Sequence, residues 1–275
     1  MKIKDHSVSN ENFELKYNSE YDLFQTHPIP ENLEQYYQSE DYISHTDSKR
    51  SLFEKIYQLV KQHTLSQKHQ LILSYTQRKG KLLDIGAGTG DFLAFVKTKN
   101  WEVMGIEPSQ KAKQLAQKKG VPFVENSQEL SDNSFDVITM WHVLEHVRDL
   151  EKQLTELKRI CKPGGYIIIA VPNFKSYDAN IYKEYWAAYD VPRHIWHFSK
   201  TAIQKLFNQN EMKLQKVHPM YFDSFYVSLL SEKYKTGKMN FIKAFWIGLV
   251  SNLKGIFSKE FSSHIYVLKN TKKPF

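Results

Sequence analysis

The chain has 275 residues, of which 41% are hydrophobic and 25% are charged, and its formal net charge is +8. This length favours one α/β domain with an appendage over two equal domains. The single cysteine, Cys161, excludes an intrachain disulfide and any multi-cysteine zinc site. The polar start lacks the apolar segment of a signal peptide, and no apolar run reaches the roughly 18 residues of a membrane span. We therefore expect a cytoplasmic protein.

The basic charge is compatible with nucleic acid or an anionic membrane as a partner. The lysines are scattered, however, with local density only at 111–119 and 233–243. A solvated lysine-rich surface is the favoured interpretation, so we do not expect a nucleic-acid partner.

The N-terminal region, residues 1–75, differs in pattern from the rest of the chain. Residues 1–35 are polar and contain two prolines, which predicts an irregular segment. Helical periodicity over 48–75 predicts two helices that dock before the main domain, residues 76–275. We expect this region to form a lid over a ligand with four of its ring-bearing side chains: Tyr36, Tyr37, Tyr42 and His45.

Strands and helices alternate from residue 81 onward. Strands are predicted at 81–85, 102–106, 122–125, 135–140, 166–171, 213–218 and 263–268. Helices are predicted at 91–99, 109–119, 150–161 and 199–208, and a turn at 163–165. This alternation predicts a parallel sheet that is covered by helices on both faces.

An insertion at about 222–258 separates the last two predicted strands. Its second half carries an apolar stripe at helical spacing, with lysines off the stripe. Because Gly248 and Ser251 interrupt the stripe, we favour a helical cap that packs on the core or on a partner subunit. The alternative is a membrane-surface helix, with peripheral contact through 239–257.

The sequence LLDIGAGTGD, residues 82–91, runs from an apolar strand into three glycines at alternate positions, Gly86, Gly88 and Gly90. Glycines without side chains let a ligand lie directly against the backbone. Glu107 ends the next apolar run, 21 residues after Gly86. This distance is close to the roughly 20 residues between a glycine loop and an acid that binds a ribose, so a nucleoside-containing ligand is predicted.

The loop chemistry selects among nucleoside ligands. The loop lacks the Gly-Lys-Ser/Thr of a phosphate loop, and its spacing is G-x-G-x-G, not the G-x-G-x-x-G of a dinucleotide site. Asp84 and Asp91 stand on either side of the glycines and would repel a pyrophosphate. S-adenosylmethionine carries a sulfonium and an ammonium but no phosphate, so it is the favoured cofactor.

The motifs LLDIGAGTGDFL, VMGIEPSQKAKQLA and SFDVITMWHVLEHV…CKPGGYIIIAVPN resemble those of class I S-adenosylmethionine-dependent methyltransferases over about residues 80–174. The stretch YDVPRHIWHFS, residues 189–199, is similar to the group called methyltransferase domain 23. The resemblance implies a Rossmann-like α/β fold with a seven-stranded sheet, mostly parallel with an antiparallel last strand, plus N-terminal helices and the helical insertion. The zinc ribbon of that group has no counterpart here, because its region has no cysteine.

The same resemblance implies a role for each matching residue. The three glycines approach the methionine and ribose, Asp84 and Asp91 face the ammonium, and Glu107 accepts both ribose hydroxyls. The residues implied at the adenine and sulfonium ends are Ile106, Pro108, Asn126, Trp141 and His142. Asn126 stands where many relatives have an aspartate, and its amide oxygen can still accept a hydrogen bond from the adenine amino group.

Methyl transfer to a hydroxyl benefits from a general base, and two clusters offer one. His142, Glu145 and His146 share a helical face. Related quinone O-methyltransferases have a Glu-x-x-Glu-His arrangement there that can hold a divalent cation. Here His142 replaces the first acid, so we expect bracing residues and no metal.

The second cluster, residues 185–198, follows the fifth predicted strand of the domain and is rich in aromatic and titratable side chains. We predict His194 or His197 as the base and Arg193 as the group that orients an acidic substrate, with Tyr189 beside them.

The leading hypothesis is a methyltransferase that acts on a small or medium-sized acceptor, at oxygen. An RNA or protein methyltransferase is the first alternative, although no Asn/Asp-Pro-Pro-Tyr/Phe motif of base methylation is present. A non-catalytic S-adenosylmethionine-binding protein is the second alternative. Acceptor pockets arise from variable loops on a shared fold, so these motifs do not identify the acceptor.

Overall fold

The computed structural model describes residues 1–37 and 52–272, with only the backbone of 52–60. A seven-stranded sheet with the order β10-β11-β8-β7-β4-β5-β6 forms its centre. Its strands are β4 (Lys81–Ile85), β5 (Glu102–Ile106), β6 (Phe123–Val124), β7 (Phe135–Trp141), β8 (Cys161–Pro172), β10 (Met212–Pro219) and β11 (Ser263–Asn270). The pairs from β6 to β8 are parallel, whereas β11 runs antiparallel to both β8 and β10. The predicted Rossmann-like sheet with an antiparallel last strand is confirmed.

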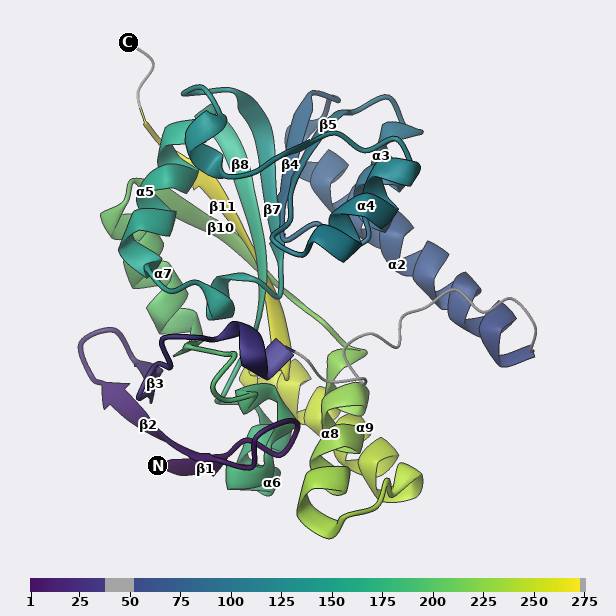
Figure 1. Cartoon of the computed structure of the whole chain (residues 1–275), viewed down its shortest axis with the longest axis vertical. Coiled ribbons are helices and arrows are strands. Elements are labelled where there is room, and N and C mark those ends of the chain that lie inside the picture. Colours follow the sequence, from purple (N-terminus) through teal and green to yellow (C-terminus); the bar gives the residue numbers. More distant parts are fainter. Residues whose placement is uncertain (38–51, 273–275) are drawn as a thin grey trace.

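Helices cover both faces of this sheet (Figure 1). One face carries α2 (Leu52–Thr76), α3 (Asp91–Lys97) and α4 (Gln110–Lys118), and the other carries α5 (Leu150–Ile160) and α7 (Lys200–Gln209). Successive strand residues alternate between the two cores, so that Leu82 packs toward α2 and α3 while Leu83 packs on the other side. Burial on both faces explains why these strands read as continuous apolar runs.

The N-terminal residues form strands, so the expectation of an irregular segment is wrong. Strands β1 (Lys2–Lys4), β2 (Asn12–Asn18) and β3 (Leu23–His27) join β9 (Trp196–His197) in a second, four-stranded sheet. Phe13 and Leu15 are buried between exposed polar neighbours. This short alternation is easily read as a polar loop, because β9, which completes the sheet, lies far along the chain.

Two further local expectations change. A single helix, α2, replaces the two predicted over 48–75. The predicted turn at 163–165 lies inside β8, where the pairing with β7 shifts in register. The proposed lid residues Tyr42 and His45 lie outside the described part of the chain.

The insertion is confirmed as a helical hairpin of α8 (Asp223–Thr236) and α9 (Phe241–Ser258), which follows β10 and precedes β11. It packs beside α6 (Tyr177–Tyr182) through a face of small residues on α9. Ser251 donates a 2.6 Å hydrogen bond to the buried Asp178 carboxylate. The large apolar side chains of α9 point outward instead, with Ile242 76% exposed. The stripe therefore does not pack on the core.

The close approach of α9 to α8 leads to a stability prediction. A Cβ atom at Gly248 would lie 2.8 Å from the Phe225 ring and 3.0 Å from its Cα. We expect Gly248→Val to lower the free energy of unfolding by about 1–3 kcal/mol because the helices must separate. Ile242→Val, on the exposed side of the same helix, should change it by less than about 0.5 kcal/mol. Urea denaturation measures both, and equal effects would contradict the observed helix orientation.

Candidate functional site

The glycine loop lies at the carboxyl ends of β4 and β5, where open α/β sheets bind ligands. The amides of Gly86 and Ala87 both donate to the Ile106 carbonyl, at 2.8 and 3.1 Å. All three loop glycines have positive φ. A Cβ at Gly86 would lie 2.4 Å from the Val143 side chain, whereas a Cβ at Gly88 would meet nothing within 4 Å. Gly86 is thus required by packing, and Gly88 faces the open space that a ligand can fill.

Glu107 is held by the backbone that surrounds it. Its Oε2 accepts from the Gly88 amide and its Oε1 accepts from the Ser109 amide, both at 2.8 Å. The residue is 9% exposed. Each carboxylate oxygen keeps a further acceptor site, so the group is oriented in advance for a pair of hydroxyls.

Asp84 is buried in the sheet at the end of β4 and accepts a 2.6 Å hydrogen bond from Thr139. Burial raises the pKa of Asp84 to about 7, despite the hydrogen bond to Thr139 and the charge of Lys68. Lys68 comes from α2, and its Nζ lies 4.1 Å from the centre of the Trp141 ring. Sequence motifs did not reveal Lys68, because only the docking of α2 brings it to the site.

Asp91 forms ion pairs with Lys61 at 2.9 Å and Lys119 at 2.8 Å, and accepts from the Thr89 hydroxyl. Burial alone would raise the pKa of Asp91, but the hydrogen bonds from these lysines and from Thr89 lower it. The two lysines neutralise the charge of the Asp91 carboxylate, and their ion pairs stabilise the loop. Of the two acids that we expected to repel a pyrophosphate, only Asp84 can therefore do so.

The remaining predicted cofactor residues lie along the same edge. Pro108 and Asn126 are exposed. The Asn126 amide oxygen already accepts from the Gln128 amide at 3.0 Å, and a carbonyl oxygen can accept a second bond. Trp141 ends β7, and its buried Nε1 has no hydrogen-bond partner among the described residues.

His142 lies between two carboxylates. Its Nδ1 is 3.3 Å from Glu145 Oε1 and its Nε2 is 3.1 Å from Asp223 Oδ2, the first residue of α8. Burial alone would lower the pKa of His142, but the hydrogen bonds that its ring donates to Asp223 and Glu145 raise it to about 10. An imidazolium has no lone pair, so His142 is not a metal ligand in this arrangement.

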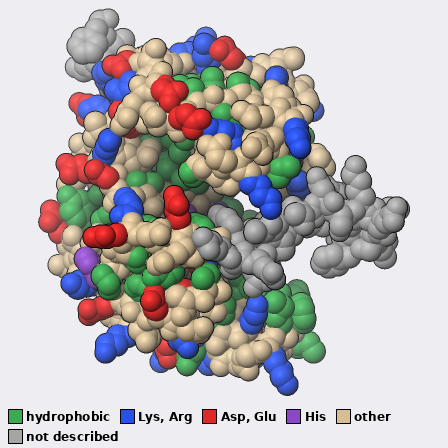
Figure 2. Space-filling view, viewed as in Figure 1, with side chains coloured by type: hydrophobic (Ala, Val, Ile, Leu, Met, Phe, Trp, Pro, Cys, Tyr) green, Lys and Arg blue, Asp and Glu red, His purple; other side chains and the backbone are tan. Residues whose placement is uncertain are grey.

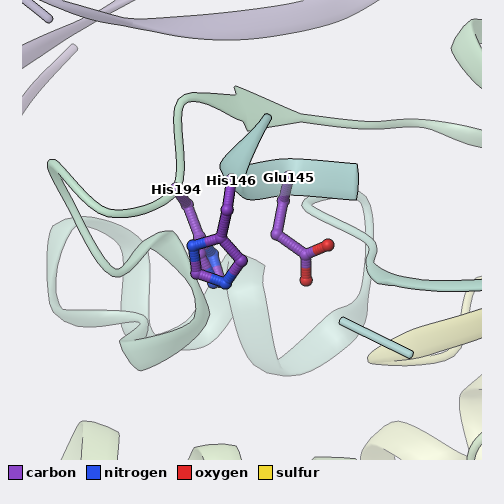
Figure 3. Close-up of side chains that lie close together, drawn as sticks. All are labelled: Glu145, His146 and His194. Atoms are coloured by element: carbon purple, nitrogen blue, oxygen red, sulfur yellow. The ribbon is translucent and has the colours of Figure 1, made fainter. Parts of the chain in front are cut away.

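Glu145, His146 and His194 form a separate cluster, which we call the Glu-His-His cluster (Figure 3). Their ligand atoms all lie within 4.8 Å of one another. Two hydrogen bonds bring the loop of His194 to the end of β7. The Ile195 amide donates to the Glu145 carbonyl at 2.8 Å, and the Trp196 indole donates to the Val147 carbonyl at 2.7 Å.

Backbone carbonyls favour the same tautomer for both imidazoles in this cluster. His194 Nδ1 is 2.9 Å from the Ala188 carbonyl. His146 Nδ1 is 3.0 Å from the Arg193 carbonyl and 3.1 Å from the hydroxyl of Tyr37, one of the predicted lid residues. Because a carbonyl only accepts, each Nδ1 carries the proton and each Nε2 keeps its lone pair. Burial and the neighbouring His194 lower the pKa of His146 to about 4, so this ring is neutral.

The Glu-His-His cluster has the ligand atoms to bind a divalent cation, and its imidazoles can also accept a proton. Apart from the ion pair with His142, the buried Glu145 oxygens have no hydrogen-bond partner among the described residues. Burial raises the pKa of Glu145, but the hydrogen bond and charge of His142 outweigh it, so the carboxylate is ionised. Two imidazoles oriented by carbonyls and one carboxylate are a common set for a transition-metal ion. The sequence led us to expect no metal at His142, Glu145 and His146; in the structure the group that could hold one is Glu145, His146 and His194.

The side chains of the other predicted catalytic residues are buried and make contacts with neighbouring residues of the protein. His197 Nε2 is 2.9 Å from the Thr26 hydroxyl, and burial places the pKa of His197 well below its usual value. Arg193 binds Asp190, the Tyr36 carbonyl and the Ser7 hydroxyl. Tyr189 is buried edge-on against Trp186, and burial raises its pKa to about 12.

Comparison with known proteins identifies the family. A family model described as a methyltransferase domain matches residues 57–217, more than half of the chain. The chain belongs to this family. It is a family of class I S-adenosylmethionine-dependent methyltransferases, and S-adenosylmethionine is the cofactor.

Relatives among curated proteins share part of the chain. The chain is 34% identical over 114 residues to an uncharacterised methyltransferase of Schizosaccharomyces pombe. The matched region is 35% of this chain and 41% of the relative. The chain is 31% identical over 109 residues to a ubiquinone biosynthesis O-methyltransferase of Vibrio atlanticus, 35% of this chain and 46% of the relative. The matching region spans about half the length of such relatives.

Solved structures share the fold. Geranyl diphosphate C-methyltransferase from Streptomyces coelicolor, solved with Mg²⁺, geranyl diphosphate and S-adenosyl-L-homocysteine, superimposes with a TM-score of 0.55 at 14% identity, covering 82% of this chain and 87% of that one. A putative sarcosine dimethylglycine methyltransferase from Galdieria sulphuraria gives 0.53 at 15% identity, covering 78% and 87%. At such identity the likeness shows the fold alone.

The geometry of Glu107 leads to a binding prediction. We expect Glu107→Gln to weaken binding of S-adenosylhomocysteine at least about tenfold, because the charged acceptor of the ribose hydroxyls is lost. Glu102→Gln, at the exposed start of the same strand, should bind as the wild type does. Isothermal calorimetry measures both. Unchanged affinity of the Glu107 variant, or wild-type binding of NAD but not of S-adenosylhomocysteine, would contradict the assignment.

Proposed function

We propose that the protein transfers the methyl group of S-adenosylmethionine to a hydroxyl oxygen of a small or medium-sized acceptor. The observation that carries this proposal is the Glu-His-His cluster, which adjoins the cofactor site. His142, at the end of the strand that borders the cofactor, contacts Glu145 directly. A neutral imidazole with a free lone pair is suited to take a proton from a hydroxyl as the methyl group arrives.

In this proposal the cofactor binds through opposite charges. Asp84 faces the ammonium of the methionine part, and Lys68 moves from its place over Trp141 to pair with the carboxylate. Glu107 holds the ribose hydroxyls, and the exposed edge at Pro108 and Asn126 receives the adenine. Trp141 lines the path of the sulfonium, with which an aromatic face interacts favourably.

His194 is the proposed base. Its Nδ1 proton is committed to the Ala188 carbonyl, which leaves Nε2 to accept. Asp190 Oδ2 lies 3.8 Å from that nitrogen, and the ionised Glu145 is also close. Both carboxylates stabilise the imidazolium that forms on proton transfer, and the cofactor supplies the carbon at which the displacement occurs.

Arg193, Tyr189 and His197 act in this scheme as positioning residues. Arg193 holds Asp190 beside His194 and ties both to the N-terminal sheet through Ser7 and Tyr36. The Thr26 hydroxyl links His197 with the backbone of His194, since it donates 2.7 Å to the His194 carbonyl. The N-terminal strands thus support the base.

A divalent cation at the Glu-His-His cluster is a second candidate for the same step. Glu145, His146 and His194 would hold it, and it would lower the pKa of the acceptor hydroxyl when bound. The buried Glu145 Oε2, which has no polar partner among the described residues, favours this candidate.

We further propose a cytoplasmic location. The one cysteine, Cys161, is buried and unpaired, which fits a reducing compartment.

Replacement of His194 tests the base. We expect His194→Gln to lower kcat by about 10²–10⁴-fold at unchanged affinity for S-adenosylhomocysteine, because the proton loses its acceptor. His63→Gln, on the exposed side of α2, is the matched control. Label from methyl-tritiated S-adenosylmethionine is followed into fractionated small molecules, lipid, protein and RNA. Undiminished kcat would refute the base, label in RNA or protein would favour the first alternative, and no label in any fraction would favour a non-catalytic binding protein.

Metal analysis separates the two candidates. If a cation is used, protein purified without chelators should hold about one equivalent of a divalent transition metal by mass spectrometry, His146→Ala should lose it, and chelation should abolish transfer. His218→Ala, on β10, is the control. Metal-free protein whose activity survives chelation would exclude the cation and leave His194 as the base.

A further inference from the structure

The outer face of the α8–α9 hairpin gathers most of the exposed large hydrophobic side chains. Eleven of the fifteen found among the described residues lie within 221–257. We call these eleven the hairpin face. Phe257 is 87% exposed, Ile242 76% and Phe241 65%. Contiguous exposed apolar surface of this kind marks an interaction site in most soluble proteins.

Helix α9 exposes its apolar face to the surface, whereas an ordinary surface helix buries its apolar face against the core. At about 100° per residue, its exposed apolar side chains from Phe241 to Phe257 fall within an arc of about 160°. The opposite side carries Ala244, Gly248 and Gly255, which are buried against the rest of the protein. The fold thus packs the small face of α9 inward and leaves its aromatic face uncovered.

Positive charge predominates around this face, although Lys243 pairs at 2.8 Å with the buried Glu232 of α8. Residues 233–259 contain six lysines and no aspartate or glutamate. Lys235 and Lys238 are exposed at the hairpin turn, and Lys243 and Lys254 both lie along one edge of the apolar arc of α9. Figure 2 shows hydrophobic and lysine side chains together over this part of the molecule.

We propose that the hairpin face docks on an anionic lipid bilayer, with α9 lying in the plane of the interface. An apolar face with lysines at the hairpin turn and along one edge of α9 matches the boundary between acyl chains and negative headgroups. No helix among residues 1–37 and 52–272 is long and apolar enough to cross a bilayer, so the contact is peripheral. A second copy of the chain is a poorer occupant, because it would bring the same lysines together.

The hairpin also connects the membrane with the site of methyl transfer. Asp223, which begins α8, contacts His142, and its neighbour Phe222 on the hairpin face is 61% exposed. An acceptor dissolved in the bilayer can therefore approach the Glu-His-His cluster along the start of α8. This inference about the acceptor rests on the proposed function. The acceptor is then an amphiphile with a hydroxyl on its polar head and an apolar tail.

Vesicle sedimentation of the full chain tests the docking. Wild-type protein should sediment with phosphatidylcholine vesicles that contain phosphatidylglycerol, and weakly with phosphatidylcholine alone. Phe245→Ser/Trp246→Ser should reduce partitioning at least about tenfold, because two large apolar groups are lost. Tyr17→Ser/Leu115→Ser, at exposed hydrophobic positions on β2 and α4, is the matched control. Lys235→Gln/Lys238→Gln should lower binding to the anionic vesicles only.

The contrary results are distinct. Absence of sedimentation with anionic vesicles, or equal binding by the Phe245/Trp246 variant, would overturn the proposal. Light scattering that shows a wild-type dimer dissociated by the same variant, without vesicle binding, would assign the face to a second copy.

The acceptor is tested separately. Methyl label is followed into the lipid and aqueous extracts of a membrane fraction, and label confined to the aqueous extract would refute the amphiphilic acceptor while leaving docking intact. Vesicle binding does not require methyl transfer. If the proposed function is wrong, no fraction should be labelled, while sedimentation with vesicles should be unchanged.

Discussion

The buried contact between His142 and Glu145 is the interaction on which the site depends. A carboxylate in the protein interior needs a compensating charge, and the imidazolium of His142 provides it. His142 also contacts Asp223 of the hairpin and directly follows Trp141 at the end of β7. One cation therefore joins the end of β7, the Glu-His-His cluster and the insertion.

The second sheet explains how distant segments meet. Strand β9 pairs with β3, so that Phe24 stands opposite His197, and this pairing holds the loop that carries His194. Arg193 extends the connection to Ser7. The N-terminal strands are thus part of the framework around His194, while the main sheet and α2 build the surroundings of the glycine loop.

The sequence predicted the strands that border the glycine loop well and the Glu-His-His cluster less well. Glycine spacing and the acid that ends the next strand's apolar run are local features, and β4 and β5 begin and end where their apolar runs do. The Glu-His-His cluster unites residues 48 positions apart, since 194 minus 146 is 48, and no local pattern encodes that meeting. For the same reason, the sequence did not reveal the position of Lys68 or the pairing of the N-terminal strands with β9.

Helix α9 shows why amphipathic patterning can mislead. The glycine and serine that interrupt its stripe resemble faults in a buried face, yet they mark the face that is buried. Periodicity identifies two faces of a helix, but the partner decides which one is covered.

This division also separates two kinds of constraint within one helix. Its inner positions are bound by shape, since added atoms collide with the backbone of α8. Its outer positions contact little of the protein, so their chemistry can change without altering the fold. The surface character of the hairpin is therefore free to diverge in evolution, or to be redesigned for solubility, on an unchanged scaffold.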